Sequence, residues 1–352
     1  MAINEDKLNE LIGQFVTDFG AAMHAATVVI GDKLGLYKAL AEHGPVAGAE
    51  LARRTGLDTR LVEEWLNAQF VSGYSAYDPA TGEFHLTEEQ AAVLADDSTP
   101  AFLAGAMTIA ASIYKDEEHI RAAFKSGKGM GWHEHDHDLF HGTERLFKPG
   151  YLGNLVSAWI PALDGVEAKL EAGAKVADIG CGHGSSTILL AQRYPASTIV
   201  GFDYHEESIE TARKRAAEAG VADRVRFEVG SAQDFPGTDY DLVCIFDALH
   251  DMGDPGGGAR PIHDSLAADG TWLLVEPMAI AGLENNVNPV SRIFYAGAVG
   301  ICTPAAEAQA GGYALGNQVS DERWAELLGE AGLTGFRRAT ETPFNRVFEV
   351  RK

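Results

Sequence analysis

A glycine-rich turn is the part of this sequence best suited to bind a ligand. Residues 176–184 pass from apolar side chains through Asp178 into three alternating glycines, Gly180, Gly182 and Gly184. A helical pattern follows over 185–194, so the segment predicts a strand, a tight turn and a helix. Because glycine has no Cβ, the backbone can turn sharply there and a ligand can press against it.

The glycine spacing narrows the class of ligand. The turn that binds nicotinamide and flavin dinucleotides follows G-x-G-x-x-G, and Ser185 stands where its third glycine belongs. A nucleoside triphosphate site would need Gly-Lys-Ser or Gly-Lys-Thr after a glycine loop, and the sequence contains neither. A doubly wound domain that binds another nucleotide is the alternative reading of this turn.

Acidic side chains follow the next predicted strands. Asp203 follows a strand over 197–202, Asp234 lies just beyond a strand over 224–229, and Asp247 follows a strand over 240–246. Ligands of open α/β sheets bind outside the carboxyl ends of the strands. A carboxylate at Asp203 can accept hydrogen bonds from both hydroxyls of a ribose, so these ends predict a nucleoside site.

The glycine turn with its preceding acid resembles motif I of the class I S-adenosylmethionine (SAM)-dependent methyltransferases. The resemblance implies SAM as cofactor, and it implies that Asp234 contacts the adenine amino group, with Ala232 and Gln233 beside it. Cys181 is interpreted as a small residue that packs in the loop. The full expected cofactor site is Asp178, Gly180, Cys181, Gly182, Gly184, Asp203, Tyr204, Ala232, Gln233, Asp234, Phe246 and Asp247.

His250 is the expected general base. The stretch 248–254 is similar to the Leu-His-Asp-Trp-x-Asp sequence of O-methyltransferases, whose histidine takes the proton of the acceptor hydroxyl. The chain departs from that pattern at Met252, which replaces the tryptophan. Asp251 is expected to orient the imidazole, and Glu276 is a second catalytic candidate that would pair with His250 or with the substrate. The alternative is that His250 only caps its loop or touches the cofactor.

A histidine-rich loop over 127–138 has three open interpretations. On a strand, His133, His135 and His137 would share a face, whereas on a helix His133, His137 and His141 would do so. Either arrangement would suit zinc, nickel or iron. The interleaved acidic residues favour a solvated loop or pocket lid instead, and direct substrate contact is the third reading. No metal site is predicted.

Residues 1–97 predict a winged-helix domain. Helical patterns over 8–19, 21–41, 47–55 and 59–72 precede a hairpin with a turn over 78–82. In the last helix, one predicted face contains Leu61, Trp65, Leu66 and Phe70. That helix carries Arg60, Glu63 and Glu64 without a basic cluster, which argues against DNA binding. The resemblance implies a dimerisation module.

The remaining chain predicts a helical connector and pocket lid over 98–169 and a SAM-binding Rossmann-like domain over 170–352. The fifth strand is expected over 271–275, ending at Glu276, and two strands are expected near 335–340 and 346–351. The segment 278–319 is longer than a plain connection needs, so we expect it to shape the substrate pocket. The fold class is α/β, with a mostly helical amino-terminal domain.

Bulk composition excludes several function classes. The 352 residues carry a formal net charge of −23, which repels phosphate backbones and disfavours nucleic acid as a partner. The three cysteines lack C-x-x-C spacing, the amino end lacks a basic region followed by an apolar run, and the apolar stretch 101–114 is too short to span a bilayer. We therefore expect a cytoplasmic protein without membrane partners.

Together these features predict a SAM-dependent methyltransferase that acts on a small molecule, at a hydroxyl group, as a homodimer. One alternative within enzymes is an N- or C-methyltransferase, or a relative that uses SAM without methyl transfer. The alternative from another class is a SAM-responsive winged-helix regulator that binds DNA.

Overall fold

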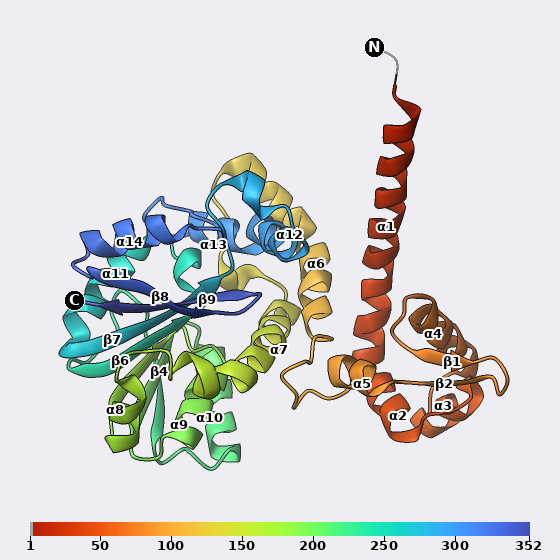
Figure 1. Ribbon diagram of the computed structural model, residues 1–352, viewed down its shortest axis with the longest axis horizontal. Coiled ribbons are helices and arrows are strands. Elements are labelled where there is room, and N and C mark those ends of the chain that lie inside the picture. The colour runs from red at the N-terminus through yellow and green to blue at the C-terminus, as the bar shows by residue number, and fades with distance from the viewer. Residues whose placement is uncertain (1–2) are drawn as a thin grey trace. The chain divides into compact units, whose positions relative to one another are not determined.

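The computed structural model describes residues 3–352, so the first two residues of the expected domain 1–97 lie outside it. Two compact units form, one from the described residues up to Lys115 with Asp136–Pro149 and the other from Asp116–His135 with Gly150–Lys352 (Figure 1). The expected connector over 98–169 is divided between these units, because the boundary falls inside α6 (Ala106–Ser126) and α7 (His137–Asn154).

The first unit has the predicted order of helices followed by a hairpin. Its helices are α1 (Glu5–Lys33), α2 (Leu36–His43), α3 (Gly48–Thr55), α4 (Thr59–Val71) and α5 (Glu88–Leu94). Strands β1 (Ala76–Asp78) and β2 (Glu83–His85) pair antiparallel. The core gathers apolar side chains from these helices and the wing, among them Val28, Leu36, Leu40, Leu51, Val62, Leu66 and Phe84.

The predicted helix break near residue 20 is wrong, because α1 runs unbroken from Glu5 to Lys33. Glycine inside a helix costs only about 1 kcal/mol, and Gly13 and Gly20 do not interrupt this one. The helix ends where Gly35 adopts a positive φ of 70°. Helix α1 is capped by the Asn4 side chain, which accepts a hydrogen bond from the Lys7 amide.

The predicted inner face of α4 is corrected in part. Trp65 and Leu66 are buried as expected, but Leu61 is 71% exposed and Phe70 also faces solvent. The residues buried with Trp65 and Leu66 are Val62 and Gln69. Gln69 is buried because its amide side chain is satisfied: Oε1 accepts from the Tyr37 hydroxyl at 2.6 Å and Nε2 donates to Thr27.

The second unit is built on a seven-stranded sheet in the order β5-β4-β3-β6-β7-β9-β8. The parallel strands are β3 (Lys175–Ile179), β4 (Thr198–Asp203), β5 (Val225–Val229), β6 (Tyr240–Phe246) and β7 (Leu266–Pro277). Strands β8 (Gly335–Glu341) and β9 (Asn345–Arg351) add an antiparallel edge. All seven were expected, although β7 begins at Leu266, which pairs with Tyr240, rather than at Thr271.

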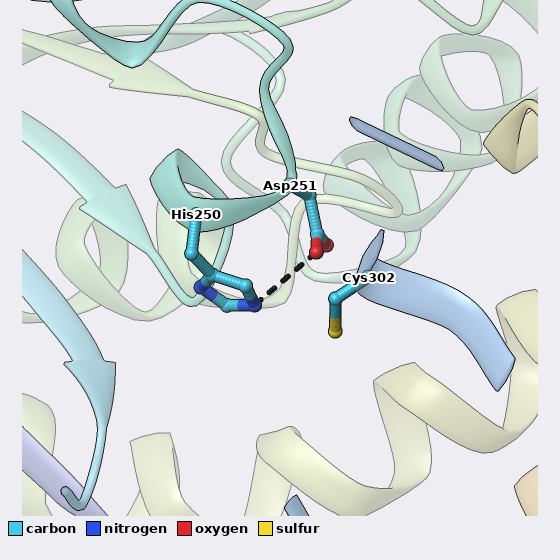
Figure 2. Close-up of side chains that lie close together, drawn as sticks. All are labelled: His250, Asp251 and Cys302. Atoms are coloured by element: carbon cyan, nitrogen blue, oxygen red, sulfur yellow. Dashed lines mark ion pairs between the residues drawn. The ribbon is translucent and has the colours of Figure 1, made fainter. Parts of the chain in front are cut away.

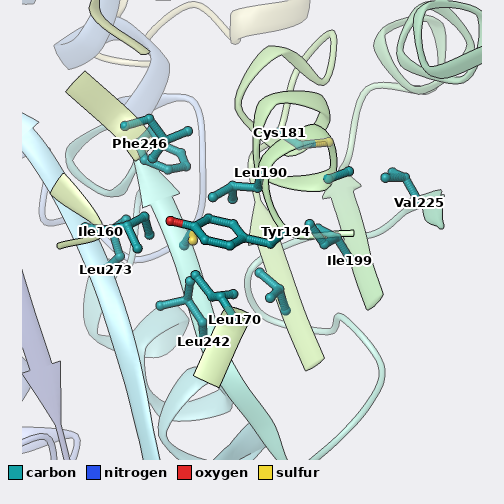
Figure 3. Close-up of a cluster of buried hydrophobic side chains, with 14 of the residues drawn as sticks. Ile160, Leu170, Cys181, Leu190, Tyr194, Ile199, Val225, Leu242, Phe246 and Leu273 are labelled. Carbon is teal, nitrogen blue, oxygen red and sulfur yellow. The ribbon is translucent and has the colours of Figure 1, made fainter. Parts of the chain in front are cut away.

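Helices cover both faces of the sheet (Figure 1). Alternate strand residues such as Val176 and Leu242 pack with α8 (Val166–Ala172), α9 (Ser185–Arg193) and α10 (Glu206–Glu218). Figure 3 shows this cluster around Tyr194. The opposite face packs against α11 (Pro255–Ser265) and α14 (Asp321–Glu330). This double cover confirms the expected α/β fold class.

The long segment after β7 forms helices of its own. It contains a 3₁₀ turn at Leu283–Asn286, α12 (Pro289–Gly297), a π-helical turn at Ala298–Cys302 and α13 (Thr303–Glu307). Shorter turns elsewhere in this unit are the 3₁₀ turns Trp132–Glu134 and Leu249–Asp251 and the π-helical turn Leu155–Trp159. Within residues 3–352, no helix is long and apolar enough to cross a membrane.

Candidate active site

The sheet order fixes where a ligand binds. Strand β3 has β4 on one side and β6 on the other, so the winding direction reverses between β3 and β6. Open α/β sheets bind ligands outside the carboxyl ends of the strands at such a switch point. The glycine turn follows β3 and the segment containing His250 follows β6, so the topology brings the expected cofactor loop and the expected base to one edge.

The glycine turn needs its glycines for two different reasons. Gly180, Gly182 and Gly184 all have positive φ, a conformation that L side chains rarely adopt. A Cβ on Gly184 would also lie 2.7 Å from the Phe227 ring, whereas one on Gly182 would meet no atom within 4 Å. The backbone at Gly182 therefore borders open space, as a loop that receives a ligand requires.

Asp178 anchors the turn from inside the sheet. Its Oδ2 accepts hydrogen bonds from the hydroxyls of Ser186 at 2.7 Å and Thr187 at 2.6 Å, both in the first turn of α9. Its Oδ1 is buried without a hydrogen-bond partner. Burial raises the pKa of this carboxyl from 3.8 to about 6, against the lowering effect of the two hydroxyls.

Asp203 connects the end of β4 to the glycine turn. Oδ2 accepts from the Gly182 amide at 2.9 Å and Oδ1 accepts from the His205 amide at 2.9 Å. These bonds fix the carboxylate, and each oxygen keeps a second lone pair. The neighbouring Tyr204 is half exposed, and Cys181 is buried with its thiol against Gly201, in keeping with its reading as a packing residue.

The residues after β5 form a small turn. Ala232 is buried, while Gln233 and Asp234 are exposed. Asp234 Oδ1 accepts from both the amide and the hydroxyl of Ser231, at 2.9 and 2.6 Å, and these bonds lower the pKa of the Asp234 carboxyl. The contact between Asp234 and an adenine amino group stays a prediction.

At the end of β6, the chain bends at Asp247, a non-glycine residue with φ of 49°. Both oxygens of Asp247 accept from the Asn345 side chain, at 2.9 and 3.0 Å. Burial first, and then the charge of Glu276, raise the pKa of Asp247 well above its ordinary value. Phe246 is buried between Tyr151 and Trp159, with ring centroids at 5.2 and 6.3 Å.

His250 and Glu276 form a buried pair. The Nδ1 atom of His250 lies 2.7 Å from Glu276 Oε2, and the side chains are 3% and 1% exposed. Of the two partners foreseen for Glu276, the structure therefore pairs it with His250. Burial lowers the pKa of His250, but the negative charges of Asp251 and Glu276 outweigh it and raise that pKa well above its ordinary value.

Asp251 contacts the imidazole on the side opposite Glu276, as its expected orienting role requires: its Oδ1 lies 3.2 Å from His250 Nε2 (Figure 2). The thiol of Cys302, from the π-helical turn, points into the same space, and burial raises its pKa to about 11. His250, Asp251 and Cys302 place one potential ligand atom each within 4.8 Å of one another.

The histidine-rich loop follows neither of the two predicted arrangements. His133 lies in the 3₁₀ turn Trp132–Glu134, and α7 begins at His137, so His137 and His141 lie one turn apart on α7 but His133 does not join them. His133 and His137 are exposed, whereas His135 is buried, with Nδ1 2.9 Å from Asp116 Oδ2. Burial and the contact with Asp116 therefore distinguish His135 from the other histidines of the loop, which the sequence spacing did not predict.

Sequence reasoning missed three residues of this region. Cys302 lies 51 positions after the His250–Asp251 dipeptide, Asn345 lies on the edge strand β9, and Asp116 lies inside α6. Only the length of the segment 278–319 signalled Cys302, because nothing in a lone cysteine marks a partner. Asn345 and Asp116 carried no sequence signal, since each reaches its partner through packing of distant elements.

Two family models match the chain. One is described as a methyltransferase domain and matches residues 170–310. The other is described as an Rv2258c-like winged HTH domain and matches residues 22–96. The methyltransferase match spans the glycine turn, the ends of β4 to β7 and the segment that contains Cys302.

Curated relatives match over about a third of the chain. The 27-O-demethylrifamycin SV methyltransferase of Amycolatopsis mediterranei is 33% identical over 129 residues, which cover 35% of this chain and 47% of that protein. The ubiquinone biosynthesis O-methyltransferase of Pseudomonas aeruginosa is 33% identical over 134 residues, covering 37% and 54%. The chain thus spans about half the length of these relatives.

Solved structures match over nearly the whole chain. Human N-acetylserotonin methyltransferase, in complex with SAM, aligns with a TM-score of 0.71 at 18% identity, covering 100% of this chain and 99% of that one. An O-methyltransferase family protein from Burkholderia thailandensis aligns with a TM-score of 0.70 at 16% identity, with coverage of 100% and 99%. Such identities establish a shared fold. The chain thus contains a region that matches a methyltransferase domain and a region that matches a winged-helix domain, and it shares the fold of these solved structures.

Proposed function

We propose that this protein transfers the methyl group of SAM to a hydroxyl group of a small-molecule acceptor, with His250 as general base. The observation that carries the proposal is the buried pair of His250 and Glu276 at the switch point, on strand ends next to the glycine turn. Such a pair holds an imidazole in one orientation beside a cofactor loop.

The residues around the glycine turn fit SAM. The open backbone at Gly182 allows close approach, and the fixed carboxylate of Asp203 keeps lone pairs for ribose hydroxyls. The buried Oδ1 of Asp178 lacks a partner, so a bound donor would satisfy it. A cluster of carboxylates also suits a cofactor that carries a sulfonium and an ammonium group.

The chain's own residues supply the base. SAM provides an electrophilic methyl carbon, so the protein must position the acceptor and remove one proton. In the proposed reaction, Nε2 of His250 accepts the hydroxyl proton as the oxygen forms its bond to the methyl carbon. Glu276 keeps the proton on Nδ1 and stabilises the resulting imidazolium. Because the pKa of His250 is raised well above its ordinary value, the imidazole must lose a proton before it can act as base, so turnover should rise with pH.

The homodimer belongs to the same proposal. One face of α1 exposes a continuous apolar stripe, Leu8, Leu11, Ile12, Phe15, Val16, Phe19 and Met23. The spacing of three and four residues matches a helix that packs against another helix. We assign the stripe to a second copy of this chain, because identical helices with this repeat complement each other in a two-fold pair.

The rival functions fit these observations less well. An N- or C-methyltransferase has less need of a base whose Nδ1 is clamped by a buried carboxylate. A DNA-binding regulator needs a basic recognition helix, yet Arg60 on α4 contacts Glu64 and the chain carries a net charge of −23.

Calorimetric titration with SAM and S-adenosylhomocysteine tests the proposal. We expect micromolar binding that Asp203→Ala weakens by ~1–3 kcal/mol, since buried hydroxyl groups lose their partners. Asp223→Ala, at an exposed position, is the matched control and should bind normally. Absence of binding to either ligand would overturn the cofactor assignment.

The base is tested next, with methyl-labelled SAM and a panel of phenolic and other hydroxyl acceptors. His250→Ala should reduce turnover by roughly 10²–10⁴-fold while leaving S-adenosylhomocysteine affinity unchanged. Turnover that survives this substitution would move the assignment to N- or C-methylation.

A further inference from the structure

Three segments far apart in the sequence meet beside His250. Asp251 follows His250 in the 3₁₀ turn after β6, Cys302 ends the π-helical turn, and the histidine-rich loop carries His135. The Met130 amide donates to the Pro304 carbonyl at 2.9 Å, which ties the histidine-rich loop to the segment after Cys302. This backbone bond places the histidine-rich loop beside the segment that contains Cys302.

The donor atoms in this region converge. Figure 2 shows the side chains of His250, Asp251 and Cys302 lying close together. His250 Nε2 lies 3.2 Å from Asp251 Oδ1, and the two atoms lie with Cys302 Sγ in a group no wider than 4.8 Å. His250 and Cys302 are buried, and Asp251 is partly exposed, so an ion could enter from its side.

Both imidazoles are oriented by carboxylates on the far side of the ring. Glu276 holds Nδ1 of His250 at 2.7 Å, and Asp116 holds Nδ1 of His135 at 2.9 Å. With Nδ1 bound to a carboxylate, the neutral ring keeps its proton there and presents the Nε2 lone pair. Histidines that bind metal ions are oriented in this way by a carboxylate or carbonyl.

His135 supplies an independent observation. Its side chain is 0% exposed, and its Nε2 has no hydrogen-bond partner in the structure. A buried polar atom without a partner is costly and calls for an explanation. The loop that carries His135 is bonded through the Met130 amide to Pro304, two residues after Cys302, so the orphaned nitrogen lies on a segment tied next to this group.

Cys302 is prepared for the same role. Its Sγ accepts from the Asn317 side chain at 3.4 Å, and Asn317 is itself held by a bond to the Phe294 carbonyl at 2.8 Å. The Asn317 bond fixes the position of the sulfur, and a bound cation must displace the thiol proton, because burial raises the pKa of the thiol and favours its neutral form.

We propose that His250 Nε2, Asp251 and Cys302 Sγ form a binding site for a zinc-type divalent cation, with His135 Nε2 as the fourth ligand. One thiolate, one carboxylate and two imidazoles are ligands that Zn²⁺ prefers, and their two negative charges neutralise the ion. Mg²⁺ and Ca²⁺ prefer oxygen ligands, so this set disfavours them. On binding, Cys302 and any protonated imidazole release their protons to solvent.

This site goes beyond the proposed methyl transfer and stands without it. It also has a consequence for that reaction, because a metal ion and an acceptor proton compete for the same lone pair on His250 Nε2. Zinc at this site is therefore expected to inhibit turnover that depends on His250, and removal of zinc by a chelator to restore it.

The test uses the full-length protein after treatment with a chelator. Co²⁺ serves as the probe, because a thiolate ligand gives it a charge-transfer absorption that imidazole and carboxylate ligands do not, and Zn²⁺ affinity is then measured by displacement. We expect one equivalent of Co²⁺ to bind with thiolate absorption. Cys302→Ser should abolish that absorption, and His135→Asn should weaken Zn²⁺ binding at least ~10-fold.

Two controls separate the proposed site from other metal binding. His133→Ala removes an exposed histidine of the same loop, and Cys244→Ser removes a buried thiol elsewhere in the sheet; both should bind Co²⁺ like the unchanged protein. Calorimetry with S-adenosylhomocysteine on every sample reports folding and the cofactor site independently of metal.

The outcomes are distinct. Failure of the unchanged protein to bind Co²⁺ or Zn²⁺ while it binds S-adenosylhomocysteine overturns the metal site and leaves the methyltransferase proposal intact. Binding that Cys302→Ser and His135→Asn leave unaltered, but His133→Ala removes, assigns the ion to the exposed loop and also overturns this site. Metal binding without S-adenosylhomocysteine binding overturns the methyltransferase proposal alone.

Discussion

Glu276 Oε2 lies 2.7 Å from Nδ1 of His250, although the two residues are 26 positions apart in the sequence. The pair forms because β6 and β7 are neighbouring parallel strands whose carboxyl ends meet at one edge of the sheet. Glu276 is buried behind the imidazole, with no surface toward an acceptor. Its role is therefore to position His250, and a positioning role makes a different prediction from direct catalysis.

Glu276→Gln should lower kcat by roughly 10–100-fold, less than loss of His250 itself, because the amide still accepts from Nδ1–H but carries no charge to stabilise the imidazolium. The KM for SAM and the affinity for S-adenosylhomocysteine should not change. Steady-state kinetics with calorimetry measures this split, and Glu276→Asp should recover part of the rate. The control is Glu284→Gln, at an exposed position. A parallel loss of SAM affinity would contradict the positioning role.

Two glycines of the turn should fail in different ways when they are replaced by alanine. Gly184→Ala places a Cβ against Phe227 at positive φ, so we expect a loss of ~1–3 kcal/mol in the free energy of unfolding. Gly182→Ala meets open space and strains only the backbone, so it should lose less stability but weaken cofactor binding. Thermal unfolding and calorimetry on both variants test this; equal stability losses would refute the distinction.

Asp178 predicts a pH-dependent contribution to stability. Its folded pKa of about 6 lies above the ordinary 3.8, so ionisation is less favourable in the folded protein. The stability linked to its protonated form is fully present below about pH 4 and is lost as the pH rises through about 6. Relative to Asp178→Asn, the unchanged protein should lose about 3 kcal/mol between pH 4 and pH 7.

Denaturant unfolding of both proteins without cofactor, at several values of pH across that range, measures this difference. Asparagine does not titrate, and all other titratable groups are the same in both proteins. The difference between their unfolding free energies therefore isolates the contribution of Asp178. A difference that stays constant with pH would show that Asp178 does not ionise in this window.

The apolar stripe on α1 predicts the oligomeric state. Phe15→Asp combined with Phe19→Asp should convert a dimer to a monomer, because two charges would be buried in the interface. Sedimentation analysis over a range of concentrations gives the mass. Val71→Asp, at an 84% exposed position on α4, should remain dimeric. A monomeric unchanged protein would remove the assignment of the stripe to a second copy.

The sequence by itself determined the sheet and the cofactor edge. The glycines of the turn, Asp203 and the end of β6 follow from local rules, since positive φ requires glycine and strand ends follow from apolar runs. The same local rules failed at α1, because Gly20 was read as a helix break and the helix continues through it to Lys33. They also failed in part to predict the buried face of α4. Gln69 lies on that face because its amide bonds Tyr37 and Thr27, and these partners come from other parts of the chain.

Only the tertiary structure decided which side chains surround His250. The spacing of the histidine-rich loop offered three or four equivalent histidines, and packing buried His135 alone against Asp116. Cys302 reached the site because the π-helical turn Ala298–Cys302 places its thiol within 4.8 Å of a ligand atom of His250 and of Asp251. Contacts between residues so distant in the chain depend on the packing of whole elements, and no local pattern of residue types encodes them.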